Sequence, residues 1–459
     1  MRTFCLLPAL CLLPFTLADA AEIGWRNDGS GLFPESSPPL EWASGVNIRW
    51  ESPLPEWGNS MPVLVGDRIF LTCEPNLLVC LSAESGEILW SKATVMEDAL
   101  DAEAIEKLER NRETIATLQA DLVKLRQEQR GMRRKIRQAK GEEKEQLQAR
   151  RSELSETINQ KETALANMGG LMKPRTHEAN GYSSPTPVSD GQSVYAVFGT
   201  GVVAAFDLDG NRLWTVLHEQ PTHPLGHSTS PRLVDGLLVV HFLQMMALSP
   251  NDGSIVWQAD VENAWGTAAV TEIGGSPVLI TPKGNIVRAE DGRILASELF
   301  TLPYGCPIVQ DGVLYAVDET GGWAYKIPER LGGDSVELEL LWRNNPPRDR
   351  YYSSPIVVDD ILYACNRAQR VSAIDIHTGD ILFSERIPFG KGQQLYGSFS
   401  LAGGHLFVSH DNGQVAVLKP GNDYELVATN TLEDSRSTPI FVDEKIFYRT
   451  SRALYCIAE

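Results

Sequence analysis

Five aromatic residues recur three positions before a repeated proline or its equivalent, which makes them the first candidates for binding chemistry. They are Tyr182, Trp265, Tyr304, Tyr352 and Tyr396. Other copies have Asn59, Ser228 and Arg436 there, with His227 one place before Ser228. If the repeats close into a ring, these side chains line one mouth of its channel, where aromatic groups with polar tips can stack a sugar or hold a peptide. The alternative, which the sequence favours, is that each side chain packs against the neighbouring repeat and serves closure.

Three histidines in one short loop are candidates for metal binding. His218, His223 and His227 fall within ten residues, and the last two are four apart. Pro221 and Pro224 exclude the helix that would bring their imidazoles onto one face, so we expect a solvated loop. The sequence also lacks a Ser-His-Asp nucleophile elbow, a phosphate-binding loop and an HExxH motif.

The cysteines allow one disulfide. Cys73 and Cys80 flank the turn residues Pro75 and Asn76, so the two thiols could meet across a hairpin. The better supported interpretation is that Cys80 is a small buried residue, because other repeats have alanine at the equivalent position. Beyond the first 20 residues the chain has an odd number of cysteines, so at least one is unpaired. They are Cys73, Cys80, Cys306, Cys365 and Cys456.

The N-terminus predicts export from the cytoplasm. Arg2 precedes the apolar run 4–17, and Ala18-Asp19-Ala20 forms a small-x-small cleavage site, so residues 1–20 are interpreted as a signal peptide. The run is shorter than the ~20 residues of a membrane-spanning helix, and Cys11 follows Leu10, which argues against lipid attachment. We expect a soluble periplasmic or secreted protein.

Composition narrows the class of partner. The chain has 459 residues with 42% hydrophobic and 22% charged residues, which is typical of a globular protein. Its formal net charge is -19, which disfavours nucleic acid and anionic bilayers because both are themselves negative.

One phrase is repeated eight times along the chain. A small polar pair and a proline precede an apolar strand, a turn with Asp or Gly, two further strands, and an Asp-x-x-Thr-Gly-x-x-Leu-Trp ending. The clearest copy begins at Ser353-Ser354-Pro355 and ends at Phe383. The proline position recurs at Pro62, Pro185, Pro231, Pro307, Pro355 and Pro439, with degenerate copies at Ala268 and Phe399.

Each unit of about 40 to 48 residues predicts four short antiparallel strands, which is the period of a propeller blade. The fold class is therefore all-β: an eight-bladed β-propeller of four-stranded antiparallel blades. The last copy ends at Glu459 without its fourth strand, and residues 46–50 form an orphan strand near the N-terminus. We expect residues 46–50 to complete the blade that begins at Arg436 and close the ring.

Large aromatic residues near the end of the repeats have a predicted packing role. Each is expected at the end of a third strand, filling the wedge between adjacent blades. These inter-blade residues are Trp50, Trp90, Trp214, Trp257, Trp342 and Phe383.

The segment 97–168 interrupts the propeller after the third strand of its first complete blade. It contains neither proline nor aromatic residues, and its apolar residues recur at spacings of three, four and seven, which predicts an α-helical coiled-coil hairpin with one irregular step near Ile115. The hairpin turn is expected at Gly141, with Gly131 as the alternative. The basic run 133–140 is expected to form a salt-bridged, solvated helix face.

The predicted organisation is a signal peptide (1–20), an extended lead segment (21–45), propeller (46–96), hairpin insertion (97–168) and the remaining propeller (169–459). We expect a protein partner to bind through blade loops or through the hairpin, because such an insertion adds little to the stability of the ring. The alternative is that the apolar seam of the insertion is buried entirely within the hairpin.

The repeat resembles a known family. Ala373-Ile374-Asp375-x-x-Thr378-Gly379 with a following aromatic residue, repeated behind a secretion signal, is similar to the pyrroloquinoline-quinone-type repeat of quinoprotein dehydrogenases. The resemblance covers 46–96 and 176–459 and implies the propeller fold. Two classes share it: calcium-dependent alcohol or sugar dehydrogenases, and non-catalytic scaffolds such as the propeller lipoprotein of the outer-membrane β-barrel assembly machine. The lead segment 24–31 is similar to that of secreted bacterial proteins of this repeat type without assigned activity.

The dehydrogenase class implies a carboxylate, an amide and a catalytic Asp around Ca²⁺, and its alcohol-oxidising members carry adjacent cysteines that this chain lacks. Asp318, Asn366 and Asp411 follow second strands, where such residues usually form turns. We therefore predict a non-catalytic binding or assembly scaffold without cofactors. A dehydrogenase with pyrroloquinoline quinone and calcium is the alternative, and a carbohydrate-binding propeller is a third hypothesis.

Overall fold

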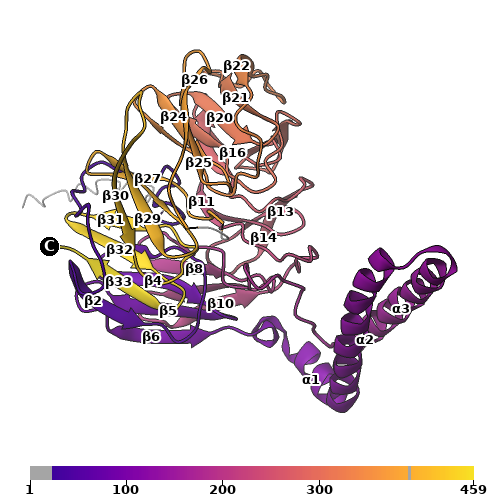
Figure 1. The fold of residues 1–459 in the computed structure, drawn as a ribbon. Helices are drawn as coiled ribbons and strands as arrows, with labels where there is room; N and C mark the ends of the chain where they lie inside the picture. Colours follow the sequence, from indigo (N-terminus) through magenta and orange to yellow (C-terminus); the bar gives the residue numbers. More distant parts are fainter. Residues whose placement is uncertain (1–22, 391–393) are drawn as a thin grey trace, which may run out of the picture.

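The computed structural model describes residues 23–390 and 394–459, and the expected signal peptide lies outside them. Within these residues the main-chain pairing forms eight sheets of four antiparallel strands, one of which carries a fifth strand. Figure 1 shows the sheets arranged as blades around a ring, with a helical arm at one side. The predicted all-β, eight-bladed propeller with a helical insertion is confirmed.

The blades follow one another in sequence, and each is built from consecutive strands. Blades 1 to 4 contain β3 (Val63–Val65), β4 (Arg68–Cys73), β5 (Leu77–Ser82), β6 (Ile88–Ala93); β7 (Val188–Ser189), β8 (Ser193–Val197), β9 (Val203–Asp207), β10 (Arg212–Val216); β11 (Arg232–Val234), β12 (Leu237–His241), β13 (Met245–Leu248), β14 (Ile255–Ala259); and β15 (Ala269–Ile273), β16 (Ser276–Ile280), β17 (Ile286–Arg288), β18 (Ile294–Ala296). Blades 5 to 8 contain β19 (Ile308–Gln310), β20 (Val313–Asp318), β21 (Gly321–Lys326), β22 (Glu339–Asn344); β23 (Ile356–Val358), β24 (Ile361–Cys365), β25 (Arg370–Asp375), β26 (Ile381–Arg386); β27 (Ser400–Ala402), β28 (His405–Ser409), β29 (Gln414–Lys419), β30 (Glu425–Thr431); and β31 (Ile440–Val442), β32 (Lys445–Arg449), β33 (Ala453–Ile457) with β2 (Ile48–Pro53).

Blade 8 joins the two ends of the chain. Strand β2 pairs antiparallel with β33, with Trp50 opposite Cys456 and Pro53 opposite Ala453. The expectation that residues 46–50 complete the last blade is therefore confirmed, with the strand running on to Pro53. Strand β33 is therefore paired on both sides, with β32 and with β2, so the C-terminal strand is not left as a free edge.

The inter-blade aromatic residues lie on fourth strands, which corrects the expected third-strand placement. Trp90, for example, lies on β6 opposite Cys80, after the turn that contains Gly86. The insertion likewise follows the fourth strand of blade 1. The error arose because the Thr-Gly turn joins the third and fourth strands, so the aromatic residue belongs to the strand beyond the turn.

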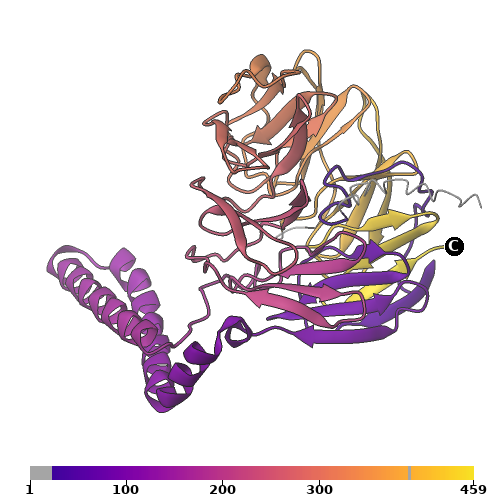
Figure 2. The same ribbon diagram turned by 180° about the vertical axis from the view of Figure 1, so that it is seen from behind.

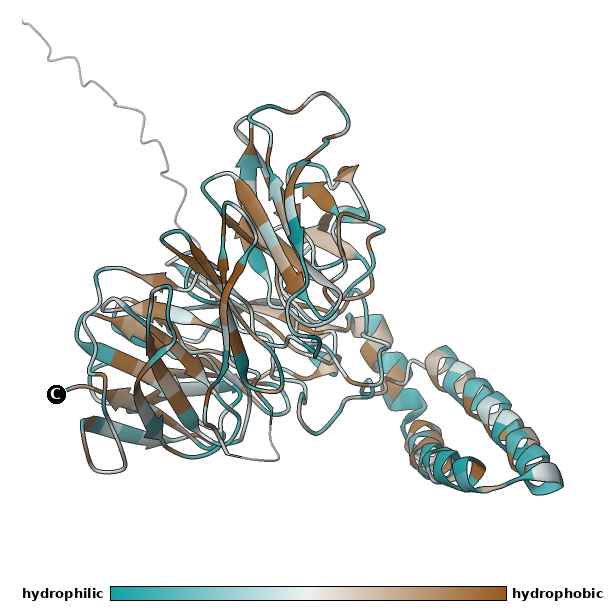
Figure 3. Cartoon of the chain, turned by 45° about the horizontal axis from the view of Figure 1, so that its top comes forward, coloured by the Kyte–Doolittle hydropathy of each residue, from teal (hydrophilic) through white to brown (hydrophobic). Residues whose placement is uncertain are grey.

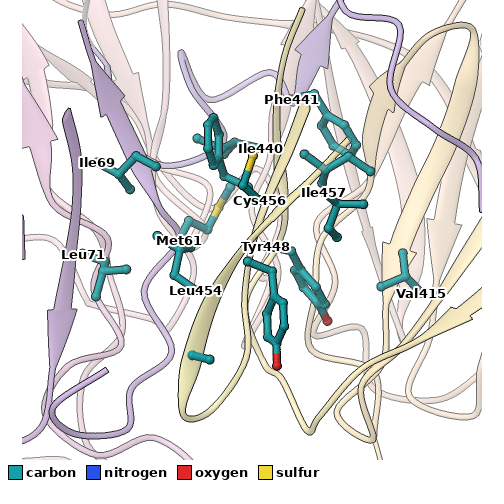
Figure 4. Close-up of a cluster of buried hydrophobic side chains, with 14 of the residues drawn as sticks. Met61, Ile69, Leu71, Val415, Ile440, Phe441, Tyr448, Leu454, Cys456 and Ile457 are labelled. Atoms are coloured by element: carbon teal, nitrogen blue, oxygen red, sulfur yellow. The ribbon is translucent and has the colours of Figure 1, made fainter. Parts of the chain in front are cut away.

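Apolar side chains fill the spaces between blades. Figure 4 shows one such cluster, in which Met61 and Ile69 of blade 1 lie near Ile440 and Ile457 of blade 8 and Val415 of blade 7. Second and third strands are mostly buried, whereas fourth strands are largely exposed. The fourth strand of each blade thus lies at the exposed periphery of the ring, and the first strand lies toward the channel.

The lead segment crosses the channel, which the sequence did not predict. Ile23 forms an antiparallel bridge with Ser189 of blade 2, and β1 (Leu32–Phe33) pairs in parallel with β27 at the inner edge of blade 7. Between them, the fully buried Arg26 guanidinium donates to Pro355 O at 3.1 Å and to Phe399 O at 2.8 Å. The lead segment thus ties blades on opposite sides of the ring together.

The insertion forms an arm of three α-helices after a short 3-10 turn. These elements are η1 (Met96–Ala99), α1 (Ala102–Arg110), α2 (Arg112–Gln138) and α3 (Gly141–Asn167). The break between α1 and α2 at Asn111 lies close to the irregular step expected near Ile115. The turn between α2 and α3 lies at Gly141, which adopts a φ of +56°, while Gly131 lies inside α2.

The arm extends away from the ring in both views of Figures 1 and 2. Ile115, Leu122, Ile158 and Leu165 form its own small apolar core, so the seam is satisfied within the hairpin. Figure 3 shows mostly hydrophilic residues on the outward surfaces of its helices. No helix among the described residues has both the length and the apolar character needed to cross a membrane.

Candidate functional site

A cavity of about 450 Å³ lies at the channel mouth, where the chain enters the first strand of each blade. We define the mouth position as the residue four places before each first strand. All eight mouth positions line the cavity; in chain order they are Asn59, Ser184, Ser228, Trp265, Tyr304, Tyr352, Tyr396 and Arg436. The structure therefore brings together seven residues at the predicted repeat position, Ser228 among them, and adds Ser184.

Tyr182 does not line the cavity, which corrects its predicted membership of the ring. Strand β7 begins after Pro187, whereas the repeat was aligned on Pro185, so the mouth position of blade 2 belongs to Ser184. The Tyr182 hydroxyl instead donates to Pro174 O at 2.8 Å. In this stretch Ser184-Pro185 is followed at once by Thr186-Pro187, so the repeat can be aligned on either proline from the sequence.

His227 is also absent from the cavity lining, which corrects its predicted position. The side chain is buried and packs 4.8 Å from the Phe242 ring. Burial, together with the nearby His241, lowers the pKa of His227 to about 3, so the imidazole is neutral. His218 contacts Gly253 O, and His223 packs edge-on against Trp265, so the three histidines of the loop do not converge.

The aromatic mouth residues of blades 4 to 7 form a continuous arc. Trp265 stacks on Tyr304 with ring centroids 5.3 Å apart, and Tyr352 stacks on Tyr396 at 5.0 Å. Tyr304 meets Tyr352 edge to face at 4.8 Å and links the two stacked pairs. Neighbouring rings therefore contact one another across three blade boundaries, which fits the expected packing role and also forms one wall of the cavity.

Two arginines cap the arc. Arg350 lies 5.6 Å from the Tyr304 ring and donates to the Tyr352 hydroxyl at 3.2 Å, and this hydrogen bond raises the pKa of Arg350. Arg436 lies 5.7 Å from the Tyr396 ring. Arg367 also lines the cavity, where Asp349 pairs with it at 2.9 Å. Sequence analysis missed Arg350 and Arg367 because neither occupies the repeated position.

The remaining part of the mouth is small and polar. Asn59 donates to Ala179 O at 2.9 Å and to the Ser184 hydroxyl at 2.9 Å, and Ser228 donates to Trp265 O at 2.9 Å. Blades 1 to 3 thus close with short polar side chains, and only blades 4 to 7 use aromatic ones. Closure alone does not require this asymmetry.

A belt of hydroxyl and thiol groups lies two residues further along the entries of blades 2 to 8. The backbone N–H of Thr186 donates to the Ser230 hydroxyl at 3.0 Å, and that of Ser230 donates to Thr267 at 3.1 Å. The same pattern joins Thr267 to the Cys306 thiol and Ser398 to Thr438. At these four junctions the earlier blade therefore donates to its successor, which stabilises the ring.

All five cysteines of the propeller are free and buried. Cys80 lies opposite Phe70 and Cys73 lies opposite Leu77, so the two thiols do not face each other across the hairpin. The disulfide considered from sequence does not form. Burial raises the pKa of Cys80 to about 12, as expected of a packing residue.

The residues considered for a quinone and Ca²⁺ do not match such a site. Asp318 accepts hydrogen bonds from its own turn at Thr320, Asn366 accepts from Arg370 N, and Asp411 accepts from Gln394 N. No Asp or Glu from residues 23–390 and 394–459 lines the cavity, whereas protein-bound Ca²⁺ requires several oxygen ligands, usually including carboxylates. In this same part of the chain, no cluster of three His, Cys, Asp or Glu side chains could hold a metal ion.

Known structures share this fold. BamB from Moraxella catarrhalis aligns with a TM-score of 0.56 and 10% identity, over 89% of this chain and 99% of that one. A europium-containing methanol dehydrogenase aligns with a TM-score of 0.56 and 11% identity, over 91% of this chain and 87% of that one. These identities establish the propeller fold and do not distinguish between the two functional classes.

Sequence comparison identifies the family of this chain. A relative from Yersinia pestis described as outer membrane protein assembly factor BamB is 24% identical over 268 residues, which cover 52% of this chain and 64% of the relative. The alignment thus spans less than two thirds of that relative. The family described as outer membrane protein assembly factor BamB matches residues 40–170 and 174–328, more than half of the chain. This chain therefore belongs to the outer membrane protein assembly factor BamB family, within the superfamily of pyrroloquinoline-quinone-like propellers.

Proposed function

We propose that this protein acts outside the cytoplasm as a non-catalytic scaffold in outer membrane protein assembly, and that the channel mouth is its protein-binding surface. Family membership supports the assembly role. The single observation that carries the binding site is the arc from Trp265 to Tyr396, capped by Arg350 and Arg436 over a cavity. Aromatic residues and arginine are the residues most enriched at the centres of protein interfaces.

A peptide fits this arc better than a sugar. The faces of Trp265 and Tyr304 lie against each other, as do those of Tyr352 and Tyr396, with interplanar angles of 22° and 24°. A sugar would need a free aromatic face on which to stack, whereas a peptide can use ring edges, hydroxyl groups and guanidinium groups. The carbohydrate hypothesis therefore has weaker support from the geometry.

The dehydrogenase hypothesis also has weaker support, because the donor set at the mouth lacks carboxylates among the described residues. Its direct test is to titrate the purified protein with pyrroloquinoline quinone and Ca²⁺ while following dye-linked alcohol and sugar oxidation. We expect no turnover. Saturable turnover would replace the scaffold assignment with an enzyme.

The assembly role is tested in cells. The gene is deleted, and the amounts of folded outer membrane proteins are measured after complementation with the wild-type gene or with Tyr352→Ala/Tyr396→Ala. We expect deletion to lower these amounts, the wild type to restore them, and the double variant to restore them only in part. The control is Val256→Ala/Leu341→Ala, at exposed positions of outer strands. Unchanged outer membrane proteins after deletion would contradict the proposed role.

A further inference from the structure

The C-terminal third of α2 carries cations that lack ionic partners. Within the described residues, hydrogen bonds and ion pairs in the arm engage Arg126 with Glu162 at 2.6 Å and Lys161 with Asp121 at 2.8 Å. The expected salt-bridged face is therefore wrong for most of the basic run. The cations of that stretch that form no ion pair or side-chain hydrogen bond with any described residue are Arg130, Arg133, Arg134, Lys135, Arg137 and Lys140, all exposed.

Four of the arginines share one face of the helix. With 3.6 residues per turn, Arg126, Arg130, Arg133 and Arg137 project in nearly the same direction, and we call them the α2 stripe. By the same geometry, Lys124 and Lys135 project from the opposite side of α2. The stripe is thus a linear array of charge along the arm.

The segment that leads from the arm back to the ring brings another cation to the stripe. Gln119 of α2 donates to Leu171 O of this segment at 2.7 Å. Partial burial and then the positive charges of Arg126, Arg130 and Arg133 lower the pKa of Arg175, while Glu162 acts in the opposite direction. Like charges held together in this way are unfavourable in the free protein and become favourable when an anion binds between them.

The same segment reaches the channel mouth. Lys173 lies 5.9 Å from the Tyr182 ring, and His177, Ala179 and Asn180 line the cavity. Arg350 and Arg436 also line that cavity. We define the basic path as the α2 stripe, then Lys173 and Arg175, then Arg350 and Arg436.

The basic path contrasts with the rest of the molecule. The chain has a formal net charge of -19, yet no Asp or Glu among the described residues lines the cavity at the end of the path. A cationic track across an acidic protein attracts an anionic ligand to one place and repels it elsewhere, which favours specific orientation.

We propose that the basic path binds an extended acidic polypeptide segment, which lies along the α2 stripe and ends at the aromatic arc. This inference rests on the proposed function and specifies the chemical class of its partner. A chain-like ligand fits because the cations lie in sequence along an arm and then enter a cavity of about 450 Å³, which a flat bilayer surface cannot enter. The aromatic arc adds contacts that a polypeptide with apolar side chains can use.

The experiment measures fluorescence anisotropy of a fluorescein-labelled, unstructured peptide rich in Asp and Tyr, with the full mature chain. A peptide with Lys in place of Asp is the ligand control. We expect saturable binding of the acidic peptide that weakens as salt is raised. Arg130→Glu/Arg133→Glu should weaken binding about tenfold, and Arg436→Gln should weaken it several-fold, because the two changes remove opposite ends of the path.

The matched control is Lys124→Glu/Lys135→Glu, which changes the net charge of the same helix by the same amount on its opposite side. It should leave the affinity within about twofold of the wild type. Equal weakening by both double variants would mean unspecific attraction and would overturn the proposal. If Arg436→Gln binds the acidic peptide as tightly as the wild type, the basic path is not one continuous site and the proposal is overturned. Melting temperatures of all variants establish that the fold is retained, and Arg137→Gln provides a milder change on the stripe.

Vesicles of phosphatidylglycerol and phosphatidylethanolamine provide the competing surface. Stripe-dependent binding to these vesicles without binding of the acidic peptide would overturn the proposal in favour of a membrane contact. If the acidic peptide does not bind, but the wild-type gene still restores outer membrane protein levels in the deletion strain, this inference is overturned and the proposed function stands.

Discussion

Trp214 of blade 2 lies directly over Gly253 of blade 3, so that a Cβ atom at Gly253 would come 2.8 Å from the indole. The indole N–H also donates to Pro250 O at 2.7 Å in that next blade. The same relationship joins Trp50 to Gly86, Trp90 to Gly210, Trp257 to Gly292, and Trp342 to Gly379. The glycine of each of these five turns is therefore required both by its positive φ and by the tryptophan of the preceding blade.

Gly253→Ala tests this relationship. Gly253 has a φ of +72°, which costs an L-residue about 1–2 kcal/mol, and the added methyl group must also displace the Trp214 ring. Gly236→Ala is the matched control, because Gly236 has a φ of +69° but nothing within 4 Å of the added atom. Denaturant unfolding should show a clearly larger loss of stability for Gly253→Ala. Equal losses would mean that the tryptophan contact adds nothing.

Trp257→Phe isolates the indole hydrogen bond. The indole N–H of this buried residue donates to Ala289 O at 2.7 Å in blade 4. Phenylalanine keeps much of the apolar contact but leaves that carbonyl without its donor, so the free energy of unfolding should fall by about 1–3 kcal/mol. Trp257→Ala should cost more, about 3–5 kcal/mol, because it also leaves a cavity. A free energy of unfolding for Trp257→Phe equal to that of the wild type would contradict a separate role for the hydrogen bond.

Tyr352→Ala separates binding from closure at the mouth. It removes ring contacts with Tyr304 and Tyr396, which together are worth about 1–3 kcal/mol of stability. Tyr352→Phe keeps both ring contacts and loses only the hydrogen bond from Arg350. We expect Tyr352→Phe to retain the melting temperature and to reduce binding of the acidic peptide. If Tyr352→Ala lowers the melting temperature and neither variant changes the affinity for the acidic peptide, the arc serves ring closure alone.

Acid should destabilise the fold through two buried histidines. Burial lowers the pKa of His227 to about 3 and that of His241 to about 4, from 6.5 in the unfolded chain. Between these values the unfolded chain binds more protons than the folded one, so the free energy of unfolding falls as pH falls below about 6.5. Each imidazole should contribute a loss of about 2 kcal/mol between about pH 7.5 and pH 5.

Chemical unfolding at a series of pH values measures this loss. His241→Gln can still donate to Val261 O, the partner of His241, and should reduce the pH dependence by about half. His377→Gln changes an exposed turn residue and serves as the control. An unchanged pH dependence in His241→Gln would contradict the assignment.

The sequence predicted the ring because its signals repeat. Period-2 apolar strands and turn glycines define each blade, and Trp50 at the end of an orphan strand was enough to predict how blade 8 closes. The predicted alignment of the repeat was wrong in blade 2, where Pro185 and Pro187 both follow small polar residues. Only the pairing of Val188 with Tyr195 fixes which proline precedes the strand and therefore places Ser184 at the mouth.

Features outside the repeat could not be predicted in the same way. Arg350 reaches the arc from a position two residues before Tyr352, and the lead segment enters the channel through the contacts of Arg26 with Pro355 and Phe399. These contacts join residues far apart in the chain without any periodic signal. Burial of His227 likewise depends on Phe242 in a neighbouring loop, so the sequence alone could not distinguish it from a mouth residue.

Site-specific crosslinking in cells tests the central claim most directly. A photoreactive phenylalanine replaces Tyr352 at the mouth or, as the control, Val256 on the exposed outer strand of blade 3. After irradiation, crosslinked partners are identified by mass spectrometry. The account predicts that outer membrane proteins or their assembly proteins crosslink at Tyr352 and not at Val256. Equal crosslinking at both positions, or none at Tyr352, would contradict the channel mouth as the protein-binding surface.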